Sequence, residues 1–167
     1  MKSEARPGAV IHAGQVQWIE TSHGSRFGFR RRQLSDGSGR LGCSIFEVAP
    51  GRSAWPRHYH CANDEAIYVL EGAGTMRLGD STVEVAAGDY VALPAGAAAA
   101  HQLINTSGAP LRYLCFSTMN EPDVAFYADS AKVGVMVGAP PGGIKERRTF
   151  SGIFRIASNV DYWDGED

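Results

Sequence analysis

The 167-residue sequence predicts an all-β domain, either a sandwich or a barrel, from two observations. Short runs rich in β-branched and aromatic residues recur along the chain, and most of the twenty glycines and eight prolines fall between them. Short strands at regular spacing, without a long helical period, are typical of such folds. The length is that of one domain with a sizeable core.

Turn signals such as Pro-Gly, Glu-Gly-Ala-Gly and Asn-Thr-Ser-Gly separate the predicted strands. Strands are expected over residues 16–19, 27–30, 41–48, 57–60, 65–70, 74–78, 82–85, 90–93, 101–104 and 111–117. After Pro122 we expect a short helical turn, followed by a strand over 132–137 and an exposed A-P-P-G-G loop. Tyr162 and Trp163 are expected to dock the acidic tail onto the barrel.

These elements divide the single domain into three regions. Residues 1–40 supply N-terminal strands that pack on the barrel or swap onto it, 41–118 form the barrel core, and 119–167 form a C-terminal extension. An N-terminal strand that covers a sheet edge or exchanges between copies favours a homodimer.

Composition argues against several classes of partner. A formal charge of −2 disfavours nucleic acid, and the basic runs at 30–32 and 145–148 are interpreted as solvated faces. The first ten residues lack the apolar segment of a leader, and no apolar run approaches the roughly 18 residues of a membrane span. Three widely spaced cysteines indicate free thiols. We therefore expect a cytoplasmic protein with a small-molecule substrate.

Three histidines and a glutamate are the candidate metal ligands. His58 and His60 lie two residues apart in R-H-Y-H, so a strand would project both imidazoles from one face. Glu65 begins the next predicted strand, and His101 follows the turn-rich L-P-A-G segment. Together these groups could hold one divalent transition metal and leave positions for a substrate.

Nearby residues offer alternatives to this set. Asp64 competes with Glu65, since the short loop tolerates either, but Glu65 starts the strand whose inward set would be Glu65, Ile67 and Val69. Cys61 alternates away from His60, which disfavours a role as ligand. The remaining histidines, at positions 12 and 23, are interpreted as surface residues.

The spacing of these residues resembles the two motifs of the cupin superfamily. The first segment is Gly51-x6-His58-x-His60-x4-Glu65-x6-Gly72, and the second is Gly88-x5-Pro94-x-Gly96-x4-His101-x3-Asn105. The resemblance implies a jelly-roll β-barrel, with His58, His60, Glu65 and His101 as metal ligands and the four glycines in turns. The chain departs from the pattern in the four alanines between Gly96 and His101, where the family usually has about two residues, so the register of His101 is open.

The tail adds a second resemblance. Y-A-D-S at 127–130 and D-Y-W-D-G-E at 161–166 look like segments of compact bacterial single-domain cupins, some of them described as sugar-phosphate-isomerase-like. A phosphosugar would require arginine or lysine in the pocket. Arg57 and Arg112 lie nearest to the motifs, and Arg57 is expected to face away from the imidazoles.

The ligand set permits three functions. The favoured hypothesis is a metalloenzyme acting on a small oxygen-rich or aromatic molecule, with Fe(II)-dependent dioxygenation slightly ahead. The alternative is a redox-neutral isomerase, lyase or decarboxylase with Mn, Zn or Ni. The third is a non-catalytic cupin that binds a small molecule. The sequence names no general acid or base.

Overall fold

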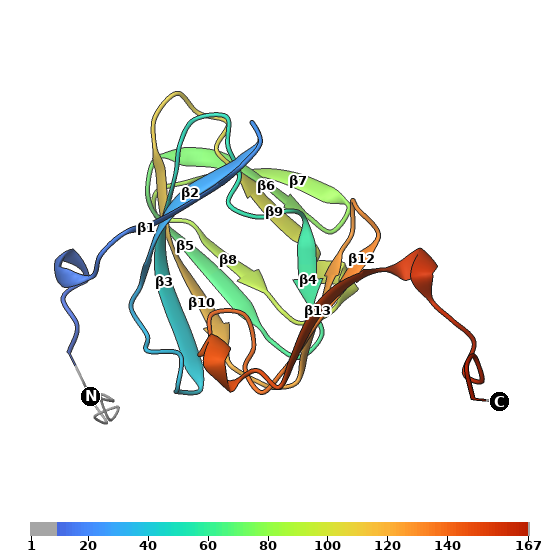
Figure 1. Cartoon of the computed structure of the whole chain (residues 1–167). Helices are drawn as coiled ribbons and strands as arrows, with labels where there is room; N and C mark the ends of the chain where they lie inside the picture. The colour runs from blue at the N-terminus through green and yellow to red at the C-terminus, as the bar shows by residue number, and fades with distance from the viewer. Residues whose placement is uncertain (1–9, 167) are drawn as a thin grey trace.

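A computed structural model describes residues 10–166 of the chain. In this part, two antiparallel sheets face each other across the core, and every helical segment is a 3-10 turn of three residues (Figure 1). The predicted all-β fold is confirmed. Residues 1–9, which carry the expectation about a leader, lie outside the described part. No described helix is long and apolar enough to span a membrane.

The first sheet has six strands, with the N-terminal hairpin at one edge. Its order is β1 (Ile19–His23), β2 (Phe27–Gln33), β3 (Leu41–Val48), β10 (Leu111–Thr118), β5 (Glu65–Glu71) and β8 (Tyr90–Leu93). β3 and β10 pair along their whole lengths, with Leu111 opposite Val48 and Thr118 opposite Leu41. This ladder joins two segments far apart in the sequence.

The second sheet has seven strands, and two of the strands that carry candidate ligands are neighbours in it. Its order is β13 (Phe150–Arg155), β12 (Lys132–Val137), β11 (Asp123–Tyr127), β4 (His58–His60), β9 (His101–Ile104), β6 (Ala73–Leu78) and β7 (Ser81–Ala86). The C-terminal region therefore extends the sheet beside the His58–His60 strand.

Side-chain alternation along the strands builds the core. β3 alternates between buried and more exposed residues over its whole length, as expected when one face of a strand lies on the core. The inward positions Ile67 and Val69 are only 5% and 0% exposed. The core cluster consists of Phe29, Phe46, Val48, Ala54, Ile67, Val69, Met76, Val85, Leu93, Leu103, Leu111 and Tyr113.

The turn glycines of the two motifs all have positive φ angles, at Gly51, Gly72, Gly88 and Gly96. Gly72 is the most constrained, because a Cβ there would lie 2.5 Å from the carbonyl oxygen of Pro110. Only glycine combines this backbone conformation with so close an approach. Gly72 thus lets the β5–β6 turn pass against the chain entering β10.

Three elements differ from the sequence prediction. The first strand begins at Ile19 rather than at residue 16, because it pairs in register with β2 as a hairpin. The expected helical turn after Pro122 is wrong: residues 123–127 form β11, which pairs with both β4 and β12. Sheet pairing on both sides outweighs the local turn signal. β13 was not predicted, since its F-S-G-I-F-R sequence lacks clear alternation.

Both ends of the described chain leave the barrel as extended arms (Figure 1). The N-terminal arm includes the 3-10 turn η1 (Ala13–Gln15), and the C-terminal arm begins at η4 (Ile156–Ser158). Tyr162 and Trp163 are 83% and 71% exposed. They contact each other with ring centroids 4.7 Å apart and do not dock on the barrel of their own chain, which corrects the prediction.

Candidate metal centre

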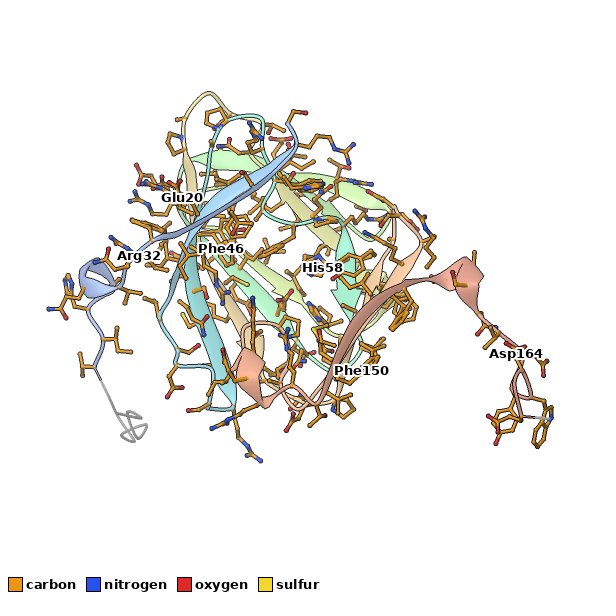
Figure 2. The ribbon with its side chains drawn as sticks, viewed as in Figure 1. Glu20, Arg32, Phe46, His58, Phe150 and Asp164 are labelled. Carbon is orange, nitrogen blue, oxygen red and sulfur yellow. The ribbon has the colours of Figure 1, made fainter. Side chains whose placement is uncertain are left out.

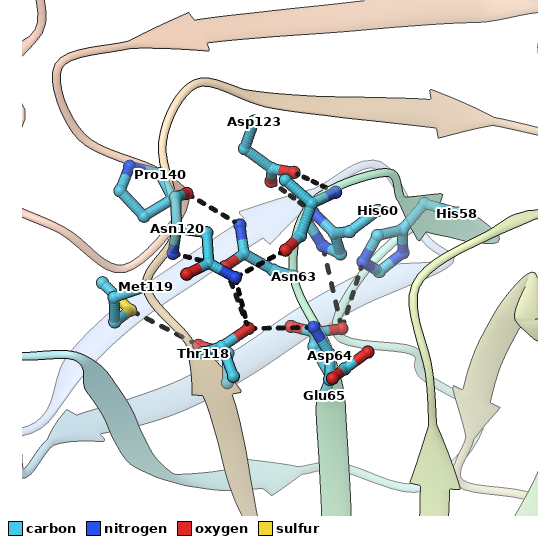
Figure 3. Close-up of polar contacts among 12 residues, drawn as sticks. His58, His60, Asn63, Asp64, Glu65, Thr118, Met119, Asn120, Asp123 and Pro140 are labelled. Atoms are coloured by element: carbon cyan, nitrogen blue, oxygen red, sulfur yellow. Dashed lines mark hydrogen bonds and ion pairs between the residues drawn. The ribbon is translucent and has the colours of Figure 1, made fainter.

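The four candidate ligands come together between the two sheets. The parity of β4 places His58 and His60 on the same face, and Glu65 approaches from β5 in the opposite sheet (Figure 3). Glu65 Oε2 lies 3.9 Å from His58 Nε2, 3.7 Å from His60 Nε2 and 3.1 Å from His101 Nε2. One carboxylate oxygen is thus the common neighbour of three imidazole nitrogens.

His101 reaches this point because the alanine segment is folded into a turn. Gly96, with φ of 112°, precedes the 3-10 turn η2 (Ala97–Ala99), and β9 then starts at His101 directly opposite His58. The Gly96 backbone N–H also donates to the His60 carbonyl oxygen at 2.8 Å. The two additional residues therefore lie in the 3-10 turn that precedes the strand, and His101 faces Glu65.

Each imidazole is held by a hydrogen bond at Nδ1. His58 Nδ1 lies 2.8 Å from the Pro56 carbonyl oxygen, and His101 Nδ1 lies 2.9 Å from that of Ala99. His60 Nδ1 lies 2.6 Å from Asp123 Oδ2. Since each of these oxygens accepts a hydrogen bond, Nδ1 is the protonated nitrogen and the Nε2 lone pair is free to bind a metal.

Asp123 is the supporting residue that sequence reasoning missed. It is the first residue of β11, is fully buried and contacts His60 (Figure 3). Burial would raise its pKa, but the hydrogen bond from His60 outweighs burial and lowers it. The same contact and the charge of Glu65 raise the pKa of His60 against the effect of burial. No pattern in the sequence pointed to Asp123, because it lies in a segment predicted as a helical turn.

The protonation states of Glu65 and His58 suit metal binding. Burial would raise the pKa of Glu65, but the close approach of His101 and of the other two imidazoles brings it down to about 2. Burial and the neighbouring His101 lower the pKa of His58 to about 4. Near neutral pH, the centre therefore offers an ionised carboxylate and a neutral imidazole, the forms that coordinate metals.

Side-chain hydrogen bonds fix the loop between β4 and β5. Asn63 Oδ1 accepts from the Asn120 backbone N–H at 2.7 Å and from the Thr118 hydroxyl at 3.1 Å (Figure 3). Asp64 turns the other way and accepts from the Ala95 N–H at 2.8 Å. Cys61 is exposed. The structure therefore places Glu65, and neither alternative, at the imidazoles.

A cavity of about 480 Å³ opens beside the ligands. Its apolar wall includes Trp55, Met136 and Ile153. The Tyr127 ring also lines it and lies 6.2 Å from the ring of His58. Cationic side chains come from two distant segments: Arg31 from β2, and Lys145 and Arg148 from the loop between β12 and β13. We call residues 139–148 of this loop the strap.

The strap is tied down mainly through backbone carbonyls. Arg148 donates to the carbonyl oxygens of Ala139 and Pro140 at 3.0 and 2.9 Å. Gln33, at the end of β2, donates to the Gly142 carbonyl oxygen at 2.9 Å. The strap is thereby held against β2, where Arg31 also lies.

The basic run at residues 30–32 is not a uniformly solvated face, because Arg31 points inward. Its neighbours Arg30 and Arg32 stack on Trp18, whereas Arg31 alternates to the inner face and donates from Nε to the Ser44 hydroxyl at 3.0 Å. Burial lowers its pKa from the ordinary arginine value. The second run, at 145–148, likewise supplies cavity residues.

The two arginines suggested by the sequence lie elsewhere. Arg57 faces away from the imidazoles, as expected, and bonds to the Gly79 carbonyl and to Asp129. Arg112 pairs with Glu47 and Glu71 on the other sheet. Neither lines the metal cavity, because strand parity directs both outward. Tyr68 is 40% exposed and Gln102 bonds to Arg77, so both point away from the metal as predicted.

The donor set fits a divalent transition ion. His58, His60 and Glu65 have donor atoms within 4.8 Å of one another, and His101 Nε2 lies beside Glu65. Ligands bound to one ion at about 2.1 Å are separated by roughly 3 Å or slightly more. Imidazole and carboxylate together accept Fe, Mn, Zn or Ni, so the set does not select one metal.

Comparisons with known proteins match part of the chain to one family. The Cupin domain family (Cupin_2) matches residues 44–117, the segment that holds all four candidate ligands. An uncharacterised protein of Methanocaldococcus jannaschii is 34% identical over 70 residues, which cover 42% of this chain and only 54% of that protein. These findings show that residues 44–117 match the Cupin domain family, and the fold of the described chain agrees with that match.

Two crystal structures match almost the whole chain. One is of a proposed sugar phosphate isomerase from Acidithiobacillus ferrooxidans, with a TM-score of 0.75 over 91% of this chain and 95% of that one. The other is of a sugar phosphate isomerase of the cupin superfamily from Silicibacter pomeroyi, with a TM-score of 0.74 over 93% and 98%. Both are 23% identical to this chain, so they show the shared fold.

A shorter match covers the barrel. The polyketide cyclase of Streptomyces resistomycificus is 29% identical, with a TM-score of 0.53 over 67% of this chain and 80% of that protein. The longer matches therefore also include strands outside the barrel core.

Proposed function

We propose that the protein is a metal-dependent, redox-neutral enzyme that isomerises a small oxygen-rich substrate with an anionic group, such as a phosphorylated sugar. The observation that carries the proposal is the placement of Arg31, Lys145 and Arg148 around the cavity that contains the His58 and Glu65 side chains. Guanidinium and ammonium groups bind phosphate or carboxylate through charge-assisted hydrogen bonds. Similarity to the two sugar phosphate isomerase structures supports the same substrate class.

Three imidazoles and Glu65 would hold the ion, and a divalent ion there would supply Lewis-acid polarisation of a substrate carbonyl or hydroxyl. The cavity cations would bind the anionic group and fix the orientation of the reacting carbons. Burial raises the pKa of Tyr127, so its hydroxyl keeps its proton and can donate a hydrogen bond to substrate oxygen. Trp55 and Ile153 line one side of the cavity.

Fe(II)-dependent dioxygenation is the second candidate, because the same ligand set accepts iron and the apolar wall formed by Trp55, Met136 and Ile153 suits an aromatic substrate. The two candidates differ in one requirement. Dioxygenation consumes oxygen, whereas isomerisation proceeds without it.

The test is an anaerobic assay of the full chain loaded separately with Mn, Zn, Ni or Fe(II). Phosphorylated aldoses and ketoses, and the same sugars without phosphate, are incubated in deuterated water and followed by NMR. We expect interconversion of aldose and ketose, with the phosphorylated compounds strongly preferred. Turnover that requires oxygen, or equal turnover of the sugars without phosphate, would contradict the proposal.

A matched pair of variants separates the cavity cations from general surface charge. Arg31→Gln should raise KM for the phosphorylated sugar more than for the sugar without phosphate. Arg32→Gln, on the outer face of the same strand, should change neither value. Equal effects of the two substitutions would show that the cavity cations do not contact the substrate.

A further inference from the structure

In the described part of the chain, the C-terminal arm carries an apolar and acidic surface that is largely exposed. Val160, Tyr162 and Trp163 are 64%, 83% and 71% exposed. After Arg155 the sequence contains no lysine or arginine but has acidic residues at 161, 164, 166 and 167. Figure 2 shows Asp164 far from the barrel. Exposed aromatic residues on a segment that leaves the body are typical of an interaction site.

A groove of about 380 Å³ with the opposite charge lies beside the point where the arm leaves the barrel. The arm starts at Ile156, whose N–H donates to the Ala131 carbonyl oxygen at 3.0 Å, and Lys132 lies on the rim of the groove. The groove is separate from the metal cavity, although Trp55 and Pro56 form part of both walls.

The charges that line the groove favour an acidic ligand. Arg26, Arg57 and Lys132 are its strong cations, His23 lies at its edge, and Asp129 is its acidic residue. Asp129 is already engaged, because it pairs with Arg57 and with Arg77 from β6. Among the described residues, Arg26 and Lys132 pair with no carboxylate; they lie over the rings of Phe27 and Tyr127.

We propose that the C-terminal arm of one copy binds in this groove of a second copy, and that the second copy returns the contact with its own arm. The Asp161, Asp164 and Glu166 carboxylates would meet Arg26 and Lys132, while Tyr162 and Trp163 would lie on the apolar floor formed by Phe27, Trp55 and Pro56. Because each arm leaves the barrel at the rim of its own groove, a two-fold axis near Ala131 would let the two arms cross with a short reach.

The size of the contact is adequate for a stable dimer. An aromatic side chain buries about 150–250 Å², so two aromatic residues on each of two arms would bury roughly 600–1,000 Å² of arm surface. The grooves would lose a similar area, and the sum falls within the roughly 1,200–2,000 Å² of specific interfaces. The inference does not depend on the metal or on the proposed reaction.

Sedimentation velocity at micromolar concentration tests whether two copies bind through their C-terminal arms. We expect the full chain to be a dimer that weakens with added salt, because the charges lie at a solvated interface. The arm variant Tyr162→Ala/Trp163→Ala and the groove variant Arg26→Glu/Lys132→Glu should each sediment as monomers with an unchanged circular dichroism spectrum. The control Tyr90→Ala, at an exposed aromatic on β8, should remain a dimer.

Mixing the two monomeric variants is the decisive measurement. A mixed pair restores one intact arm in one intact groove, so heterodimers should appear although neither variant dimerises alone. A monomeric wild type, or variants that remain dimers, would overturn the proposal. A mixture that remains monomeric would overturn it too, since an arm that folds back into its own groove cannot be rescued by another chain.

Discussion

The metal centre and the strap face the same cavity but are built differently. At the centre, each imidazole has a fixed partner at Nδ1, and the loop before Glu65 is fixed by Asn63. In the strap, Arg148 bonds to strap carbonyls, and Lys145 forms no ion pair with any described residue. Hydrogen bonds therefore orient the side chains of the centre, whereas Lys145 of the strap is exposed and can pair with an anionic ligand.

The largest effect is expected from removing the carboxylate at the centre. Glu65→Gln should lower the affinity for Zn²⁺ by more than the roughly 100-fold that loss of a supporting residue can cause, because a direct ligand is lost. Isothermal titration calorimetry of the metal-free protein measures this. The control is Asp64→Asn in the same loop, which should leave the affinity unchanged; if Asp64→Asn has the larger effect, the ligand assignment is wrong.

A smaller loss is expected when the support of an imidazole is removed. Asp123→Asn should lower the Zn²⁺ affinity by about 10- to 100-fold, since His60 loses an anionic partner that fixes its tautomer. Asp129→Asn, which removes a carboxylate outside the centre, serves as the control in the same titration. An unchanged affinity in Asp123→Asn would show that the backbone alone orients His60.

The cationic wall should affect ligand affinity and leave metal affinity unchanged. Arg31→Gln should weaken binding of inorganic phosphate to the metal-free protein by about tenfold, which corresponds to roughly 1.4 kcal/mol. Calorimetry with phosphate measures this, and Lys145→Ala should show a smaller loss because Lys145 is exposed. A parallel loss of Zn²⁺ affinity in Arg31→Gln would show that Arg31 also supports the metal ligands.

The smallest effect concerns pH. Because the pKa of His58 falls from 6.5 to about 4 on folding, the unfolded chain binds this proton more readily than the folded one. The resulting stability is complete above pH 6.5 and is lost as pH falls toward 4. Thermal unfolding in chelator should therefore show a Tm that falls across this range. His58→Asn should reduce the slope.

Much of the barrel and the grouping of the candidate ligands could be predicted from the sequence because both depend on local periodicity. Strand parity placed His58 and His60 on one face, and turn glycines such as Gly72 marked where strands end. The sequence did not predict the strand register of His101, because the spacing does not show that three of the four alanines before it form a 3-10 turn.

The supporting residues could not be predicted because they depend on contacts between distant segments. Asp123 reaches His60 only because β11 pairs with β4. Local turn signals led to a predicted helical turn in place of this strand. The sequence did not single out Arg31, because it is the middle residue of a run of three arginines and only this one points inward. The docking of Tyr162 and Trp163 was predicted wrongly, because aromatic character predicts burial without saying which surface provides it.

The strap and the ligands come from different parts of the chain, and this separation has a practical consequence. Residues 139–148 can be replaced, lengthened or recharged without altering any ligand or any Nδ1 partner. Substitutions in the strap should therefore change substrate selectivity without changing the candidate ligands. A library restricted to the strap would explore new substrates on an unchanged centre.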